Sequence, residues 1–544
     1  MRKMSLLFSL LGAVVCVAQE EASPAKLKGV LLVNDSSRIK ETDLSQINGV
    51  QFDGLLPTAG DLRDELAPFL SNYPITADGV KKLCEAVASH YRQAEDLRVI
   101  VTAPEQNATD GVVQLVVTPE KLGEVHIKNN RFTSPDVLRK WVRLSSADAI
   151  NEKTIAQDLG WMNTNPFRSV KVEYQSGDKP GVTDVDLLVS DKKSWKLSSG
   201  VDNTGNQLIG PLRIFAGVDV NDFIFTDHTL SLKGTTADRY AEYQSYSLQY
   251  AAPLAWRHIV KLSGSYTGTF PAEWTGPSKQ HRHSYQASGR YAVPHWFGAN
   301  PWVDQLSFEG GVDFKGTNTN ILQEGNPTPT EKRLAYVGQF AGGVYGERKR
   351  EDNKITAGLD LVGSPAKMLP NQSDTDFSNL RTGATPQYLY SRLVFALDQK
   401  LPSDWKLFFQ GRGQYSFSTL LPSEQLALGG FSTVRGYEEK IVNGDHAVCG
   451  NLEVRTPSFK AVGTWVPKFA DSLYFLGFVD GGSAWFRTPV DGVADNQSLL
   501  GVGTGLRYSV ASYFSSRLDF GFPLLKVEKD SGNARVHFNA VLSY

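Results

Sequence analysis

The sequence predicts two small α+β modules, each with the order β-α-α-β-β, followed by an all-β, 16-stranded antiparallel transmembrane barrel. Three observations lead to this prediction. Helical periodicity occurs only before Lys193, residues 193–544 alternate between apolar and polar positions, and the last strand places an apolar or aromatic residue at every second position. The expected domains are therefore residues 19–120, 121–192 and 193–544.

Residues 1–18 have the layout of a secretory signal peptide. Basic Arg2 and Lys3 precede the apolar run Leu6–Val17, which is too short to cross a bilayer as a helix. Small residues at the end of this run precede Gln19, as they do at a cleavage site. The chain is therefore expected to be exported, and fold reasoning starts near Gln19.

The first module is expected in residues 19–120. Residues 77–92 place five apolar side chains on one helix face, at spacings of three or four: Val80, Leu83, Cys84, Val87 and Tyr91. A shorter helix around Leu62 and Leu66 is expected to end at Pro68, because proline lacks the N–H that a helix interior needs. Strands are expected at 27–33, 97–102 and 111–118.

The second module, residues 121–192, repeats this order. Ser134 and Pro135 start one helix, Asn151 can cap a second, and strands are expected at 123–128, 170–174 and 185–189. Each module would then hold a three-stranded sheet. The exposed edge of such a sheet can accept an extended peptide as an additional strand.

Sixteen strands of about ten residues are expected after Lys193. Hydrocarbon offers no partner for an unpaired backbone group, so the strands must close into a barrel, with long loops facing outward and tight turns facing the periplasm. The strands begin near Trp195, Leu212, His228, Ala241, His258, Ser284, Gln305, Leu334, Lys354, Gln387, Lys406, Ala447, Leu473, Leu499, Ser515 and Arg535.

The last strand shows the alternation best. Its polar positions fit a wet lumen, and its apolar positions fit lipid: Val536, Phe538, Ala540, Leu542 and Tyr544. A soluble sandwich could also alternate, but a final exposed aromatic favours an outer-membrane barrel. Phe538, Leu542 and Tyr544 are therefore interpreted as the insertion signal.

One loop, at about residues 417–446, is far too long to serve only as a turn. It carries Val434, Arg435, Gly436 and Tyr437 in a row. Downstream, Asp480 is a carboxylate in an otherwise apolar strand. If the loop folds into the barrel, the planar guanidinium can bind that acid, and glycines 436, 481 and 482 let the two backbones approach closely.

Other classes of function are disfavoured. A net charge of -2 gives no basic face for nucleic acid, and the glycine-rich loop lacks the Gly-Lys-Ser/Thr of a phosphate-binding loop. His281 and His283 have no nearby carboxylate or cysteine cluster, so a lumen or rim position is favoured over a metal site. Cys84 and Cys449 fall in different domains, which argues against a disulfide. No enzyme, metal or cofactor is expected.

Two motifs resemble the signatures of the BamA-like outer-membrane assembly and translocation superfamily: VRGY at 434–437, and F-x-D-x-G with Phe478, Asp480 and Gly482. That superfamily joins periplasmic POTRA modules of β-α-α-β-β order to a 16-stranded barrel. Two modules resemble the two-partner secretion transporters (the ShlB/FhaC/HecB family, TpsB). So do five short segments: Asp202–Gly205, Gly210–Arg213, Leu428–Gly430, Gly444–Asp445 and Asn451–Arg455.

The resemblance implies an outer-membrane transporter with its N-terminal domains in the periplasm. Its partner would be an unfolded secreted exoprotein that binds at the POTRA sheet edges and crosses through the barrel without a nucleotide. Outer-membrane lipids and the barrel assembly machinery would be further partners.

One feature departs from this family, whose members usually carry a plug helix before the first module. Only residues 19–26 precede the first expected strand, so no such helix is expected. An assembly factor of the BamA/TamA type is therefore the alternative function. A passive porin is disfavoured by the two modules.

Overall fold

The computed structural model describes residues 25–41, 44–54, 62–70, 73–272, 278–297, 300, 302–323, 328–466, 469–488, 496–527 and 532–544. The expected signal peptide lies outside these residues. The chain forms two compact units divided between Lys192 and Lys193, except that residues 296–301 group with the first unit. Within the described ranges, no helix is both long and apolar enough to cross a membrane.

The first module contains a four-stranded sheet of order β2-β1-β4-β3, with two helices packed on it. The buried face of α2 carries Leu83, Cys84, Val87 and Tyr91, as its periodicity predicted. The elements are β1 (Gly29–Val33), η1 (Ser36–Arg38), η2 (Leu44–Gln46), β2 (Gly49–Asp53), α1 (Leu62–Leu70), α2 (Ala77–Ala94), β3 (Val99–Thr102) and β4 (Val112–Pro119).

Two predictions for this module are wrong. The sheet has four strands, because two short 3₁₀ turns return the chain so that β2 pairs in parallel with β1. Helix α1 continues past Pro68 to Leu70. Pro68 lies in the last turn, where its missing N–H removes only one late intrahelical bond.

The second module has the predicted order and a three-stranded sheet, β5-β7-β6. Leu138, Ile155 and Met162 from its helices pack on Val170, Val185 and Leu187 of the sheet in a separate core. The elements are β5 (Lys121–Lys128), α3 (Pro135–Arg139), α4 (Glu152–Met162), β6 (Arg168–Ser176) and β7 (Val182–Asp191).

The two predicted caps of this module differ. The Asn151 side chain accepts a hydrogen bond from the Thr154 N–H at 2.8 Å, which satisfies one of the orphan donors at the start of α4. Ser134 occupies the equivalent position of α3 without making a side-chain capping bond. The hydroxyl predicted to cap α3 therefore does not do so.

Asn151→Ala is expected to destabilise the start of α4 by about 1 kcal/mol, because the Thr154 N–H loses its partner. Hydrogen exchange of the full-length protein should speed up at residues 153–156. Ser134→Ala is the matched control and should leave exchange in α3 unchanged. Equal exchange in the Asn151 variant and the native chain would show that the cap contributes nothing.

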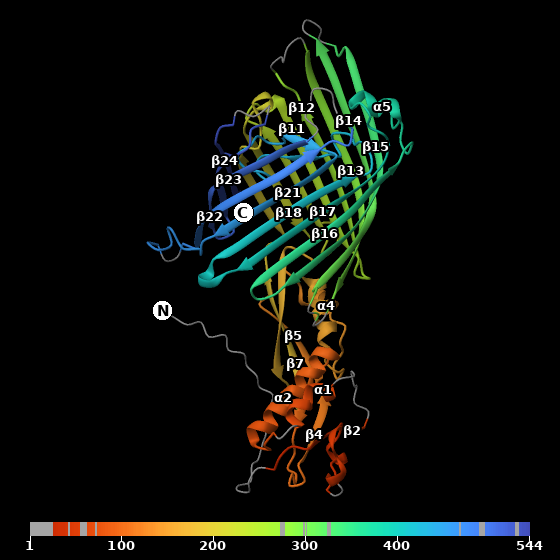
Figure 1. Cartoon of the computed structure of the whole chain (residues 1–544), viewed down its shortest axis with the longest axis vertical. Helices are drawn as coiled ribbons and strands as arrows, with labels where there is room; N and C mark the ends of the chain where they lie inside the picture. The colour runs from red at the N-terminus through yellow and green to blue at the C-terminus, as the bar shows by residue number, and fades with distance from the viewer. Residues whose placement is uncertain are drawn as a thin grey trace. The chain divides into compact units, whose positions relative to one another are not determined.

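The second unit is a closed antiparallel barrel of 16 strands, which confirms the predicted fold class (Figure 1). In barrel order the strands are β8 (Trp195–Asp202), β9 (Arg213–Asn221), β10 (Thr229–Ala237), β11 (Tyr243–Pro253), β12 (Ile259–Thr269), β13 (Ser278–Trp296), β14 (Gln305–Gln323), β15 (Glu331–Lys349), β16 (Asn353–Pro365), β17 (Gln387–Lys400), β18 (Lys406–Ser416), β21 (His446–Arg455), β22 (Asp471–Trp485), β23 (Asn496–Val510), β24 (Phe514–Pro523) and β25 (Arg535–Ser543).

The strands vary in length more than expected. Strands β13, β14 and β15 have 19 residues each, roughly twice the predicted ten, so β13 starts six residues before the expected Ser284. Shorter elements connect the strands: η3 (Gln207–Ile209), η4 (Tyr240–Glu242), α5 (Asp374–Leu380), η5 (Pro402–Asp404), β19 (Leu426–Leu428) and β20 (Val442–Gly444).

The barrel closes where β25 pairs with β8 over only five residue pairs, from Asn539–Asp202 to Ser543–Ser198. The Asn203 side chain extends this short seam, donating to the Val536 carbonyl at 2.6 Å and accepting from the Phe538 N–H at 2.9 Å. Leu542 of β25 and Tyr544, directly after it, are exposed on the outward side, whereas His537 of β25 is buried on the lumen side. The alternation along the strand thus separates two environments.

Candidate functional site

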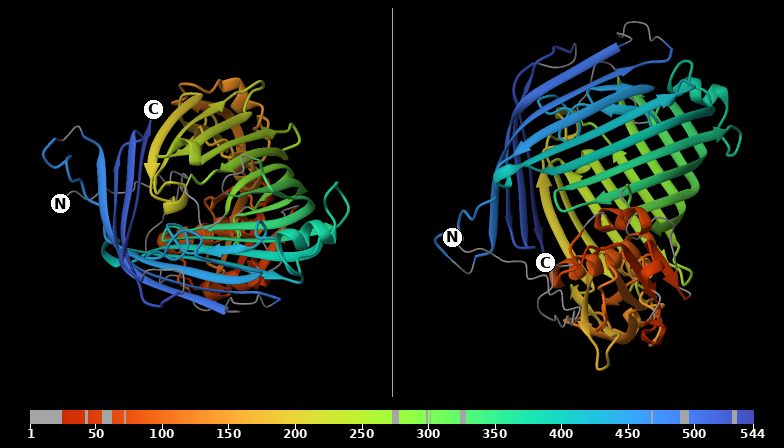
Figure 2. Two further views of the ribbon diagram at one scale, coloured as in Figure 1. Left: turned by 90° about the horizontal axis from the view of Figure 1, so that it is seen from above. Right: turned by 60° about the horizontal axis from the view of Figure 1, so that its bottom comes forward.

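The segment between β18 and β21, residues 417–446, folds into the barrel interior; we call it the inward loop (Figure 2, light blue in the left view). Its strands β19 and β20 pair with each other as a small hairpin. Leu428, Val434 and Tyr437 of the loop are fully buried against a cluster of wall residues that includes Cys449 and Leu499. The loop is therefore packed on the wall like a small hydrophobic core.

Arg435 is the polar centre of this contact and is only 2% exposed. Its Nε and Nη2 donate to the two carboxylate oxygens of Asp480 at 2.6 and 2.8 Å, and its backbone N–H donates to the same carboxylate at 3.1 Å. Its Nη1 donates to Glu453 at 2.7 Å, and the guanidinium lies 3.5 Å from the centre of the Phe478 ring. Three strand residues thus hold one side chain by charge, hydrogen bonds and a cation–π contact.

A wider charge network surrounds this pair. Asp519 of β24 lies 3.6 Å from the Arg435 guanidinium and accepts from Arg507 at 2.7 Å and from Arg517 at 2.6 Å. Arg455 donates to Glu453 at 2.7 Å. The buried carboxylates at 453, 480 and 519 are therefore all paired, which removes most of the cost of keeping them out of water.

The residues after Arg435 are held by the last strands of the barrel. The Gly436 N–H donates to Nε2 of His537 at 3.1 Å, and Arg535 pairs with Glu438 at 2.8 Å. The Tyr437 hydroxyl lies 2.9 Å from the Leu500 carbonyl and 2.8 Å from the Leu525 carbonyl. The VRGY segment therefore contacts all five strands from β21 to β25 and is fixed against the barrel wall.

Glycine is required where loop and wall backbones meet. Gly436 has φ +96°, which other residues rarely adopt. A Cβ at Gly501 would lie 2.0 Å from the Arg435 carbonyl oxygen, and one at Gly521 would lie 2.5 Å from the Gly436 nitrogen. These two glycines were not predicted. Gly501 lies on β23, beside β22, and Gly521 lies on β24, beside β25. Their position on the inward face of these strands is the sequence signal that could have identified them.

The predicted wall glycines divide into two kinds. A Cβ at Gly482 would lie 2.8 Å from the Cys449 Cβ and 2.9 Å from the Val448 carbonyl oxygen on β21, and 3.1 Å from the side chain of Leu428, so this glycine makes room for both the neighbouring strand and the loop. A Cβ at Gly481 would meet the Leu500 side chain at 3.6 Å and the Leu499 carbonyl oxygen at 3.9 Å, both ordinary contacts with the neighbouring strand. Gly481 therefore does not help the two backbones approach, and that expectation is wrong.

The base of the inward loop is held by a second buried acid, Asp445. Arg381, in the connection between β16 and β17, donates to both of its oxygens at 2.6 and 2.8 Å. The backbone N–H groups of Leu420 and Arg487 donate to the same carboxylate at 2.9 and 3.0 Å. Three connections at one end of the barrel thus converge on one carboxylate.

The connection that carries Arg381 also packs inside the barrel end. Phe377 of α5 is fully buried with Val362, Tyr388 and Leu420, which come from the lumen side of β16 and β17 and from the inward loop. Below them, Glu424 accepts from Lys315 and from the Tyr390 hydroxyl, each at 2.9 Å. Sequence reasoning did not identify this second inward-packed segment, because an isolated seven-residue helix in a loop carries no distinctive motif.

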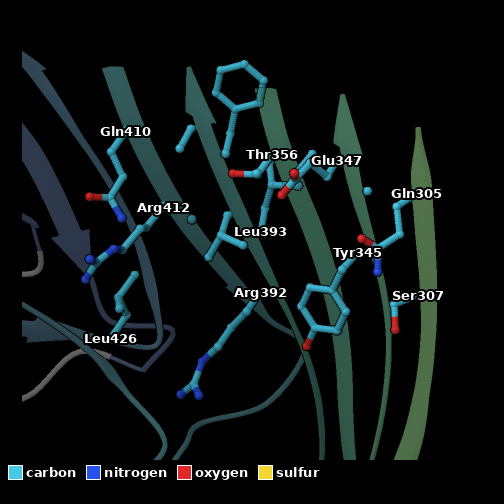
Figure 3. A pocket seen from close by; sticks show the side chains of 16 residues that line it. Gln305, Ser307, Tyr345, Glu347, Thr356, Arg392, Leu393, Gln410, Arg412 and Leu426 are labelled. Carbon is cyan, nitrogen blue, oxygen red and sulfur yellow. The ribbon is translucent and has the colours of Figure 1, made fainter. Parts of the chain in front are cut away.

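A cavity of about 780 Å³ opens beside the inward loop on the lumen wall (Figure 3). It is lined by β14 to β18 and by Leu426 of the loop. Figure 3 shows polar side chains along this wall, among them Arg392, Arg412 and Tyr345. The wall therefore presents both polar and apolar side chains to the space that the loop does not fill.

The remaining predicted residues lie away from this site. The histidines at 281 and 283 are on β13, where both rings contact Phe270 and the His283 ring nitrogen lies 3.0 Å from the Tyr266 hydroxyl. Cys84 is buried in α2 and Cys449 in β21, and both thiols are free. Among the described residues, no cluster of His, Cys, Asp and Glu side chains could hold a metal ion.

Comparison with known proteins agrees with this architecture. Residues 366–543 match the Omp85 superfamily domain. The heme/hemopexin transporter protein HuxB of Haemophilus influenzae (strain 86-028NP) is 23% identical over 489 residues, which cover 85% of this chain and 80% of HuxB. The outer membrane transporter CdiB of Dickeya dadantii (strain 3937) is 25% identical over 466 residues, covering 82% and 76%. The structure of CdiB from Escherichia coli superposes with a TM-score of 0.71 at 15% identity, over 98% of this chain and 94% of CdiB.

The barrel, the two modules and the seated VRGY loop define an outer-membrane protein of the Omp85 superfamily, with its N-terminal POTRA modules in the periplasm. Within that superfamily, the chain is an outer-membrane transporter of the two-partner secretion (TpsB) type, as its motifs predicted. The end of the barrel where β8 begins is therefore the periplasmic end, and the Asp445 cluster lies at the outer end.

Proposed function

We propose that this transporter secretes one partner exoprotein. The partner reaches the POTRA modules (residues 19–120 and 121–192) unfolded and crosses the outer membrane through the barrel lumen. The observation that carries the proposal is the inward loop, which is not part of the wall. It is held in the lumen by non-covalent contacts alone, namely the polar contacts around Arg435 and the apolar packing of Leu428, Val434 and Tyr437. The named transporter relatives support the same class of function.

The modules offer backbone edges for such a partner. In the second module β7 is central, so β5 and β6 are the two edges of the sheet. Asn163 already bonds both backbone groups of Val170, at 2.7 and 3.0 Å, near the start of β6. The partner is therefore proposed to pair along residues 171–176, in the manner of strand addition.

Closure of the outer end is proposed to depend on two segments. The inward loop fills one part of the lumen, and the α5 connection packs against it through Phe377 and Arg381. Both must move before a chain can pass. Because each is held by buried ion pairs, the closed state persists without cargo, and cargo binding supplies the free energy for opening.

Comparison of the medium from cells with and without the gene tests the proposed function. Loss of one large exoprotein, with unchanged amounts of other outer-membrane proteins, is the expected result. A general fall in outer-membrane proteins with no missing exoprotein would instead indicate an assembly factor of the BamA/TamA type. The exoprotein identified in this way then serves as the cargo in export assays.

Arg381→Ala is expected to increase the open fraction of the pore about tenfold or more in planar bilayers, because it leaves the Asp445 carboxylate buried without its cation. Arg333→Ala is the matched control. Arg333 pairs at 2.6 Å with Glu331 in a roughly half-exposed pair near the start of β15, so its loss should leave conductance unchanged. Identical conductance of the Arg381 variant and the native protein would exclude a role for α5 in closure.

A further inference from the structure

The periplasmic connection between β21 and β22 differs from the tight turns expected at that end. It spans residues 456–470, whereas the neighbouring connection between β23 and β24 has only residues 511–513. We call residues 456–466 the inner flap. Figures 1 and 2 show this region projecting sideways from the barrel wall, in blue near the start of β22.

The inner flap presents large apolar side chains to its surroundings. Trp465 is 86% exposed, Val466 50%, Phe459 47% and Val462 43%. The N–H groups of Trp465 and Val466 both donate to the Val462 carbonyl, at 2.9 and 3.0 Å, so these three residues lie on one tight turn. A group of exposed apolar residues on an ordered turn indicates contact with another apolar phase.

Specific bonds hold the inner flap on the outward side of the barrel. Phe459 exchanges two backbone hydrogen bonds with Leu473, at 2.9 and 2.8 Å. The Asp471 carboxylate accepts the N–H groups of Ala461, Val462 and Gly463 at 2.8–2.9 Å. Asp480 points into the lumen, so alternation along β22 places Asp471 on the outward face. The flap amides, together with the Tyr508 side chain, therefore satisfy a carboxylate on the outward face of the strand.

The flap is continuous with the lipid-facing surface. The Phe459 ring centre lies 6.0 Å from that of Phe475, which is exposed on the outward face of β22. Asp471 pairs with Val510, next to the periplasmic turn that exposes Tyr513. Exposed Trp256 and Trp405 lie in other turns at the same end. Such aromatic residues mark the level of the membrane–water interface.

We propose that the inner flap is an in-plane membrane anchor, inserted into the phospholipid headgroup region of the periplasmic leaflet. Trp465, Val462 and Val466 enter the boundary of the acyl chains, and exposed Lys460 reaches lipid phosphates. The anchor would fix the base of the β21–β22 hairpin, which carries Glu453 and Asp480. This inference does not depend on what the barrel transports.

Fluorescence quenching tests the anchor. The full-length variant Trp465→Cys is labelled with an environment-sensitive dye and placed in phosphatidylethanolamine/phosphatidylglycerol vesicles. Background labelling of the native cysteines is expected to be low, because Cys84 and Cys449 are buried. The amount of dye that the native chain takes up measures this background. Controls are Val479→Cys on the outward face of β22 and Asp178→Cys on an exposed turn of the second module.

The dye at 465 is expected to be quenched by nitroxide lipids labelled near the headgroup and to be shielded from iodide, relative to the dye at 178. Quenching by iodide as strong as at 178, without quenching by the lipids, would place the flap in water and overturn the proposal. Shielding from both quenchers would indicate a protein partner and would also overturn it. Val466→Cys repeats the measurement if the first variant folds poorly.

Discussion

Arg435→Ala is expected to leave a folded barrel in the outer membrane while reducing export of the partner exoprotein by more than tenfold. The substitution leaves the fully buried Asp480 carboxylate without its cationic partner. It also removes the same cation from Glu453 and Asp519. Removing one partner from a buried ion pair costs about 3–5 kcal/mol. A cost of this size lowers the ratio of molecules with the inward loop bound to the wall to those with it released by about 100-fold or more.

Two readouts separate loop displacement from misfolding. Mobility of unheated samples in detergent gels reports the folded barrel, and secreted exoprotein reports transport. Arg435→Lys keeps the charge but not the planar fork, so it should export at an intermediate level. Full export by a well-expressed alanine variant would contradict the role proposed for the seated loop.

The charge swap Arg435→Asp with Asp480→Arg is a weaker test of the direct pair than the single substitution. A simple pair would be restored by the exchange. In the structure, an acid at 435 would also face Glu453 and Asp519, which contact the native guanidinium at 2.7 and 3.6 Å. We therefore expect the double variant to recover little export, and failure of this swap does not argue against the direct pair.

Gly501→Ala is expected to reduce export as strongly as Arg435→Ala without changing any charge. The added Cβ would lie 2.0 Å from the Arg435 carbonyl oxygen, a backbone atom that can yield only if the loop moves. Hydrogen exchange in residues 430–440 should become faster in this variant, because the loop can no longer pack closely against β23. Secretion assays and bilayer conductance measure the functional effect.

Gly481→Ala is the matched control for this experiment. Gly481 is the neighbour of Asp480 and pairs with Leu500, yet an added Cβ would make only ordinary contacts, at 3.6 Å with a Leu500 methyl group and at 3.9 Å with the Leu499 carbonyl oxygen. Export should stay near the native level. If the two alanine variants behave alike, close approach of the loop backbone to the wall does not govern transport.

The fold class and the central pair follow from local sequence patterns. Alternation of period two in residues 193–544 predicts the barrel, because a strand between lipid and lumen must present different chemistry to each side. Arg435 in a long loop and Asp480 in an apolar strand were each conspicuous for the same reason. A charge in such surroundings needs a partner of opposite sign.

Only the tertiary structure decided which other residues share this site. Glu453, Asp519 and His537 lie 18, 84 and 102 positions from Arg435 and come together through barrel register and the depth of the loop. Alternation predicts that a side chain points inward, but not its height along the axis. The same limit applies to Arg381 and Asp445, since their pairing depends on how two connections fold over one opening. Local sequence therefore determined the face of each residue, and long-range strand pairing determined its neighbours, because sheet register is set by contacts between distant segments.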